Sequence, residues 1–96
     1  MNRDEYVQKL KSQIDQWNAE AAKWEAKARQ AQAGMQAEYA HQLEQFRARR
    51  DAAMSELTRL QSASADAWTD MMKGADAALR NLQEAFDRAR REFDKR

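Results

Sequence analysis

The sequence predicts an all-α protein folded as an antiparallel coiled-coil hairpin. Charged residues make up 34% of its 96 residues, and Ala, Gln, Glu, Arg, Lys and Leu dominate, a composition typical of long helices and coiled coils. There is no proline and there are only two glycines, so few residues oppose helix formation. Apolar residues recur at alternating steps of three and four along most of the chain, the spacing of a coiled-coil stripe. We therefore expect one domain over residues 1–96, without a β-strand.

The first predicted element is a long helix over about residues 3–61. Its N-terminal part, residues 7–35, carries a strict apolar stripe made up of Val7, Leu10, Ile14, Trp17, Ala21, Trp24, Ala28 and Ala31. Gly34 lowers helix propensity by about 1 kcal/mol. Beyond Gly34, successive apolar residues are four positions apart. This irregularity, a stutter, preserves the apolar stripe only if the helix is continuous. We therefore predict a single helix about 88 Å long.

The segment Ser62-Ala63-Ser64-Ala65-Asp66 is the predicted turn of the hairpin. Ser and Asp compete for backbone hydrogen bonds and favour turns, and either Ser64 or Asp66 is expected to cap the next helix. Apolar positions on the two sides of this segment mirror each other, as facing residues of an antiparallel pair must. The predicted hairpin core, within residues 35–93, consists of Met35, Tyr39, Leu43, Phe46, Leu57, Leu60, Trp68, Met71, Leu79, Leu82, Phe86 and Phe93.

The second predicted helix, over about residues 67–95, is only half as long as the first. It covers the first helix back to about Met35 and leaves residues 7–31 as an overhang. Contiguous apolar patches on soluble proteins usually mark interfaces. We therefore expect the overhang to be a self-association interface between two copies, whether parallel or antiparallel.

An alternative fold breaks the first helix near Gly34, so that the overhang folds back and the chain forms a three-helix bundle of near-equal helices. The segment from Gln30 to Glu38 argues against it, because apart from Gly34 it is strongly helix-forming and offers no loop. Ion pairs spaced four residues apart, such as Glu25–Arg29, further support helix along the exposed faces.

The composition excludes several kinds of chemistry. Without cysteine there are no disulfides, thiolate nucleophiles or thiolate metal ligands. With one histidine and no glycine-rich loop, neither a catalytic triad nor a phosphate cradle can be assembled. Glu38 and His41 have the Glu-x-x-His spacing of di-iron helical bundles, but a complete site needs a second such unit and two further carboxylates. We predict a non-enzymatic protein without a metal or cofactor.

The charge distribution favours protein partners over nucleic acid. The net charge is +1, and acidic neighbours offset the two basic runs, Arg47–Arg50 and Arg88–Arg91. No apolar segment approaches the roughly 20 residues that span a bilayer, and the N-terminus lacks the apolar core of a signal peptide, so we expect a cytoplasmic protein. An alternative hypothesis is that the amphipathic helices bind a lipid or polymer-granule surface. Their mixed charges suit protein–protein pairing better.

Four segments resemble a family of short bacterial coiled-coil proteins labelled stress-response or coiled-coil domain-containing proteins. They are Asp4-Glu5-Tyr6-Val7-Gln8-Lys9-Leu10-Lys11, Gln13-Ile14-Asp15-Gln16-Trp17-Asn18-Ala19-Glu20, Ala37-Glu38-Tyr39 and Ser64-Ala65-Asp66-Ala67-Trp68. The resemblance implies a cytoplasmic, stress-associated protein of bacteria and supplies no catalytic residue or ligand. We expect an interaction or structural protein that forms a homodimer or higher oligomer, or pairs with another coiled-coil protein.

Overall fold

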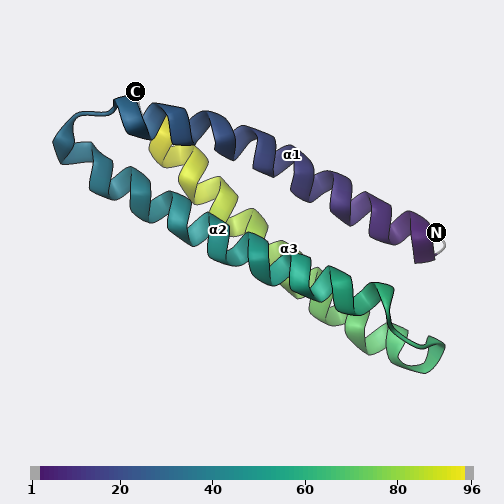
Figure 1. Ribbon diagram of the computed structural model, residues 1–96. Coiled ribbons are helices and arrows are strands. Elements are labelled where there is room, and N and C mark those ends of the chain that lie inside the picture. Colours follow the sequence, from purple (N-terminus) through teal and green to yellow (C-terminus); the bar gives the residue numbers. More distant parts are fainter. Residues whose placement is uncertain (1–2, 95–96) are drawn as a thin grey trace.

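The computed structural model describes residues 3–94, which form three α-helices and two short connections. The helices are α1 (Arg3–Gln30), α2 (Ala33–Gln61) and α3 (Ala65–Asp94), and the described residues contain no strand. They form an elongated bundle measuring 52 × 17 × 17 Å, in which α2 runs antiparallel to both other helices (Figure 1). The predicted all-α class is confirmed.

The prediction of one continuous helix over residues 3–61, and with it the two-helix hairpin, is wrong. The helix breaks at Ala31 and Gln32, and the chain reverses there. Gln32 has φ −61° and ψ 152°, and its carbonyl accepts hydrogen bonds from the backbone N–H groups of Met35 and Gln36. Gly34 lies within α2, and a Cβ at this position would meet no side chain of a non-adjacent residue and no other helix within 4 Å. The alternative three-helix bundle is therefore the observed fold, with its break just before Gly34.

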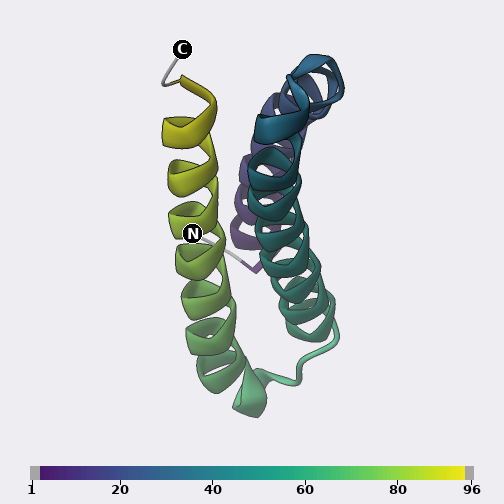
Figure 2. The same cartoon turned by 90° about the vertical axis from the view of Figure 1, so that its left-hand side faces the viewer.

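The three helices do not contact one another equally. The α2–α3 pair makes the closest backbone contact, α1 lies along α2, and α1 approaches α3 least (Figure 2). Large side chains of α1 fill the space towards α3: the Trp24 ring lies 5.0 Å from Phe86 and 5.4 Å from Phe93, between ring centroids. These rings separate the backbones of α1 and α3. The bundle therefore consists of a closely packed α2–α3 hairpin and of α1, which packs against it mainly through side chains.

The predicted turn between residues 62 and 66 is confirmed, with α2 ending at Gln61 and α3 beginning at Ala65. The Ser64 hydroxyl oxygen accepts a hydrogen bond of 3.3 Å from the backbone N–H of Ala67. Ser64 is therefore the N-cap. Asp66 lies in the first turn, where its negative charge interacts favourably with the helix dipole. The helix begins two residues before the predicted start at 67, and the predicted end at 95 lies outside the described residues.

The predicted hairpin core is largely the core of the bundle. Eight of its members are buried, namely Tyr39, Leu43, Phe46, Leu57, Leu60, Leu82, Phe86 and Phe93. The other four, Met35, Trp68, Met71 and Leu79, are partly buried against the core. At one end the three helices share an aromatic cluster, in which the Phe93 ring lies 4.3 Å from that of Tyr39 and 5.4 Å from that of Trp24.

The predicted overhang over residues 7–31, within the oligomerisation segment 7–35, is also wrong, because its stripe is covered by the chain's own α2 and α3. Five of the eight residues assigned to a self-association interface are buried in the core, namely Val7, Leu10, Ile14, Ala21 and Trp24. The other three, Trp17, Ala28 and Ala31, are partly buried against it. The reversal at Ala31 and Gln32 makes the three helices nearly equal in length, which removes the mismatch on which the overhang depended.

Candidate interaction surface

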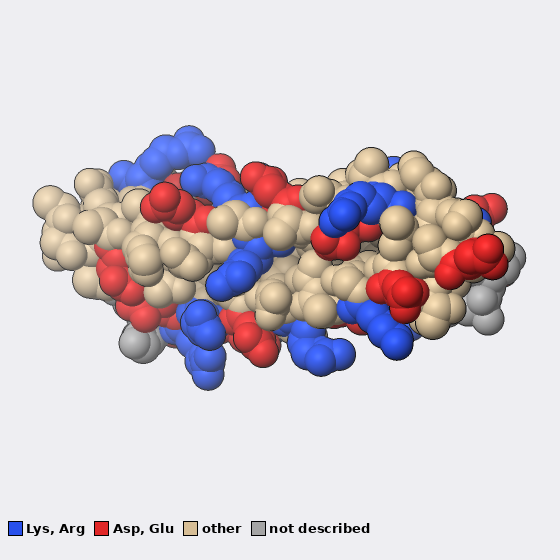
Figure 3. Space-filling model, turned by 90° about the horizontal axis from the view of Figure 1, so that it is seen from below, with Lys and Arg blue, Asp and Glu red and all other residues tan. Residues whose placement is uncertain are grey.

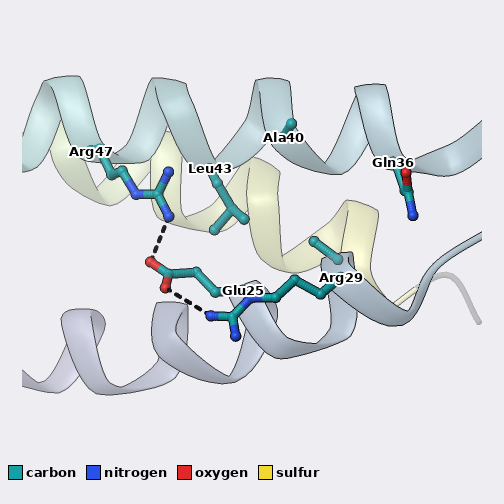
Figure 4. A pocket seen from close by; sticks show the side chains of 7 residues that line it. Glu25, Arg29, Gln36, Ala40, Leu43 and Arg47 are labelled. Carbon is teal, nitrogen blue, oxygen red and sulfur yellow. Dashed lines mark hydrogen bonds and ion pairs between the residues drawn. The ribbon is translucent and has the colours of Figure 1, made fainter. Parts of the chain in front are cut away.

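A shallow groove runs along the surface between α1 and α2, close to their connection (Figure 4). We call it the α1–α2 groove; its volume is about 420 Å³ and it is open to solvent. Its lining consists of Glu25, Ala28, Arg29, Gln36, Ala40, Leu43 and Arg47. Helical spacing places these residues together, because positions three and four apart share one face of a helix. Small or apolar side chains form part of the lining, and charged ones stand at its edges.

Glu25 links the two walls of the α1–α2 groove. Its carboxylate accepts a hydrogen bond of 2.6 Å from the Arg47 guanidinium of α2 and lies 3.9 Å from the Arg29 guanidinium of its own helix (Figure 4). The hydrogen bond from Arg47 is the main cause that lowers the pKa of Glu25 below its ordinary value, and nearby Arg29 and Arg50 act in the same direction. The groove therefore presents both signs of charge within one helical turn.

Replacing Arg47 with Ala is expected to destabilise the fold slightly, in a pH-dependent way. Because the pKa of Glu25 is lowered in the folded chain, its pairing stabilises the fold above the unfolded value of 4.5 and is lost as the pH falls through the folded value. Both side chains are at least a third exposed, so we expect a loss of about 0.5 kcal/mol at pH 7. Urea unfolding of both chains over a series from about pH 7 to about pH 2 measures it, and the difference should shrink as the pH falls below 4.5. A difference that stayed constant over the whole series would contradict the assignment to Glu25, and exposed Arg49→Ala is the control.

A second groove, of about 470 Å³, lies between α1 and α3. Its lining consists of Gln16, Trp17, Glu20, Phe86, Arg90 and Asp94. The half-buried Trp17 ring stacks on Phe86 at 5.6 Å between centroids, so aromatic surface is reached from solvent here. Figure 3 shows basic and acidic side chains interspersed over one face of the molecule, without a large patch of one sign. Such a surface offers no extended field for nucleic acid.

Polar side chains fasten both ends of α1 to the α2–α3 hairpin. At its start, the Arg3 guanidinium donates to the carbonyl of Ala63 and lies 4.8 Å from the Trp68 ring centroid. At its end, the Lys27 ammonium donates to the carbonyl of Phe93 in the last turn of α3. A cation at this place interacts favourably with the helix dipole. Sequence reasoning missed both residues because they lie beside the apolar stripe, and only a three-helix register would have brought them to these helix ends.

Tyr6 makes a further polar contact between α1 and α3. Its hydroxyl donates to the Asp76 carboxylate, and its ring lies edge-on to Trp68 with 5.9 Å between centroids. Burial first, and then the hydrogen bond to Asp76, raise the pKa of Tyr6 above its ordinary value. The phenol therefore stays protonated and keeps donating to Asp76 throughout the physiological pH range.

The structure does not bring the Glu-x-x-His pair into a site. Glu38 and His41 are both exposed on α2, and within residues 3–94 no three His, Asp or Glu side chains gather closely enough to hold a metal ion. None of the helices in this part of the chain has the length and apolar character needed to cross a membrane. Comparisons with protein families, with curated proteins and with solved structures gave no match to this chain.

Proposed function

We propose that the protein is a non-enzymatic interaction protein that binds a helix of another protein or of a second copy of itself. The observation that carries this proposal is the α1–α2 groove, which combines small and apolar lining residues with charges of both signs. The sequence resemblance supports placing this activity in the bacterial cytoplasm and in a stress response.

The lining of the α1–α2 groove matches what an amphipathic helix needs from a binding surface. Ala28, Ala40 and Leu43 leave room for apolar side chains of a partner helix, as in helix-in-groove recognition. Glu25, Arg29 and Arg47 stand beside them and can pair with charges on the partner's flanks. A small molecule usually needs a more enclosed pocket than this open groove, so a helix is the better fit.

The test fills the groove without touching the core. Ala40 is exposed, so Ala40→Trp is expected to fold normally while its indole occupies the α1–α2 groove. Analytical ultracentrifugation over a concentration series measures self-association, and affinity capture from bacterial extract measures other partners. We expect binding by the unaltered chain and its loss in Ala40→Trp, with the exposed Ala48→Trp as the control. Equal binding by both variants would exclude the groove, and no binding in either assay would overturn the proposal.

A second candidate function is binding to a lipid or polymer-granule surface, and the position of α1, which makes few backbone contacts with α3, favours it. If α1 lifts away, its apolar face, with Trp17 and Trp24, becomes free to enter an interface. Co-sedimentation with anionic liposomes at low salt tests this, and absence of binding would remove the lipid case.

A further inference from the structure

The connection between α1 and α2 has the properties of a hinge. It consists of two residues, Ala31 and Gln32, and contains neither proline nor glycine. The φ of Gln32, −61°, is already that of an α-helix, so this residue departs from helical geometry in ψ alone, which is 152°. The extended and the helical conformation are both ordinary for a residue with a side chain. None of the described residues, glycine included, has a positive φ. Straightening the connection therefore creates no backbone strain.

The sequence across the connection favours the straightened form. The residues from Gln30 to Ala33 are good helix formers, and a continuous helix would supply the backbone hydrogen bonds that the ends of α1 and α2 forgo at the reversal. The apolar stripe also runs through the connection without a change of face, from Ala28 through Ala31 and Met35 to Tyr39. What holds the chain in its folded-back form is the burial of the stripe of α1 against α2 and α3.

We infer that two copies of this chain exchange their α1 helices, forming a dimer in which residues 3–61 of each are one continuous helix. This inference rests on the proposed self-association, and it names exchange of α1, not docking in the α1–α2 groove, as the way in which two copies meet. Exchange of an identical element between two copies is a low-cost route to a dimer, because the contacts formed are those the single chain already makes. The second copy is the partner that fits, because its α1 carries the same side chains that already fill the site on α2 and α3.

The geometry of the bundle allows every contact of α1 to be kept after the exchange. Because α1 and α2 are antiparallel and joined by two residues, a two-fold axis through the hinge lays α1 of each chain along α2 of the other in the same register. Each α3 stays on its own α2, so Trp24 of one chain would still meet Phe86 and Phe93 of the other. The dimer would be an end-to-end pair of bundles, roughly twice the 52 Å length of one.

The absence of cysteine allows a direct test. In the double variant E25C/R47C, two thiols replace side chains that meet across α1 and α2 at 2.6 Å. The protein is unfolded and refolded at high concentration, the dimer is isolated, and a short bismaleimide is added. In an exchanged dimer the cross-link joins two chains, so denaturing gels show a band of twice the chain mass. In a dimer of folded-back chains the cross-link stays within each chain and the band keeps the mass of one.

A hinge variant completes the test. Ala33 is the first residue of α2, where proline is accepted, and the extended Gln32 before it has the conformation that proline requires. In a continuous helix a proline at residue 33 would be an interior breaker, so Ala33→Pro should weaken the dimer by about a hundredfold for each of its two hinges. Ala33→Ser changes the same exposed position but keeps the N–H, and should dimerise within a few-fold of the unaltered chain.

The outcomes separate this inference from the proposed function. Interchain cross-links that Ala33→Pro abolishes and Ala33→Ser retains would support the exchange. A dimer with only intrachain cross-links, or one that survives Ala33→Pro, would overturn the exchange while leaving self-association intact. A chain that stays monomeric after refolding would overturn the exchange, and the groove would then be judged by Ala40→Trp and the other partners alone.

Discussion

Replacing Trp24 with Ala is expected to destabilise the isolated chain by about 3–5 kcal/mol, a large part of the roughly 5–15 kcal/mol that holds a small domain together. The indole is 4% exposed and lies where the three helices meet. Its ring contacts three others, with centroids 5.0 Å from Phe86, 5.4 Å from Phe93 and 6.5 Å from Phe46. Its removal leaves a cavity that α1 alone cannot close without losing contacts elsewhere.

The urea midpoint of unfolding, followed by far-ultraviolet circular dichroism at low protein concentration, measures the effect of Trp24→Ala. Trp17→Ala is the matched control, because Trp17 is half-buried and stacks on Phe86 alone, so it should cost less than half as much. If Trp24 instead lay at an interface between copies, as the sequence predicted, Trp24→Ala would lower the mass measured by sedimentation. It would leave the urea midpoint of unfolding of the monomer unaltered. That result would contradict the three-helix packing.

The α2–α3 hairpin was predictable because its turn has a chemical signal. Ser and Asp cluster between residues 62 and 66, and Ser64 caps α3 through its side chain. The apolar positions on either side also mirror each other, which placed the core of both helices correctly. Arg50 interrupts this core, and the structure gives the reason: its guanidinium reaches α1, where it donates to the Asn18 side chain at 3.0 Å.

The reversal at Ala31 and Gln32 was not predictable from local signals, because tertiary packing overrides helix propensity there. Interrupting a helix costs a few backbone hydrogen bonds, each worth about 1 kcal/mol net. Folding back buries Val7, Leu10, Ile14 and Trp24, at about 1.5–3 kcal/mol for each large apolar side chain. Burial therefore wins. The length mismatch correctly indicated that the stripe had to be covered, but it did not say that the chain itself would cover it.

The candidate surface was harder to predict than the fold. The Glu25–Arg29 pair follows from a spacing of four residues, and the two atoms lie 3.9 Å apart. The shorter contact between Glu25 and Arg47 depends on the reversal, because on a continuous rod these two residues would be far apart. Both grooves beside α1 likewise exist only because α1 folds back against α2 and α3. An incorrect prediction of one connection therefore misses a whole surface, while most of the predicted core residues are still correct.

Phe93→Ala is expected to cost about 3–5 kcal/mol, although the residue lies in the last turn of α3. Terminal turns usually fray, and substitutions there are usually tolerated. Here the ring is 1% exposed and stacks between Tyr39 at 4.3 Å and Trp24 at 5.4 Å, so it joins side chains of all three helices. Its carbonyl also accepts the hydrogen bond from Lys27. The loss of the ring should therefore release the ends of both α1 and α3.

Chemical denaturation gives the size of the Phe93→Ala effect, and amide hydrogen exchange gives its location. We expect faster exchange at residues 21–30 as well as in the last two turns of α3, because the ring fastens both segments. Phe93→Leu retains most of the apolar volume and should recover a large part of the lost stability, whereas Arg88→Ala on the exposed face of the same helix should stay within about 0.5 kcal/mol of the unaltered chain. Faster exchange confined to the end of α3 would mean that Phe93 does not hold α1 in place.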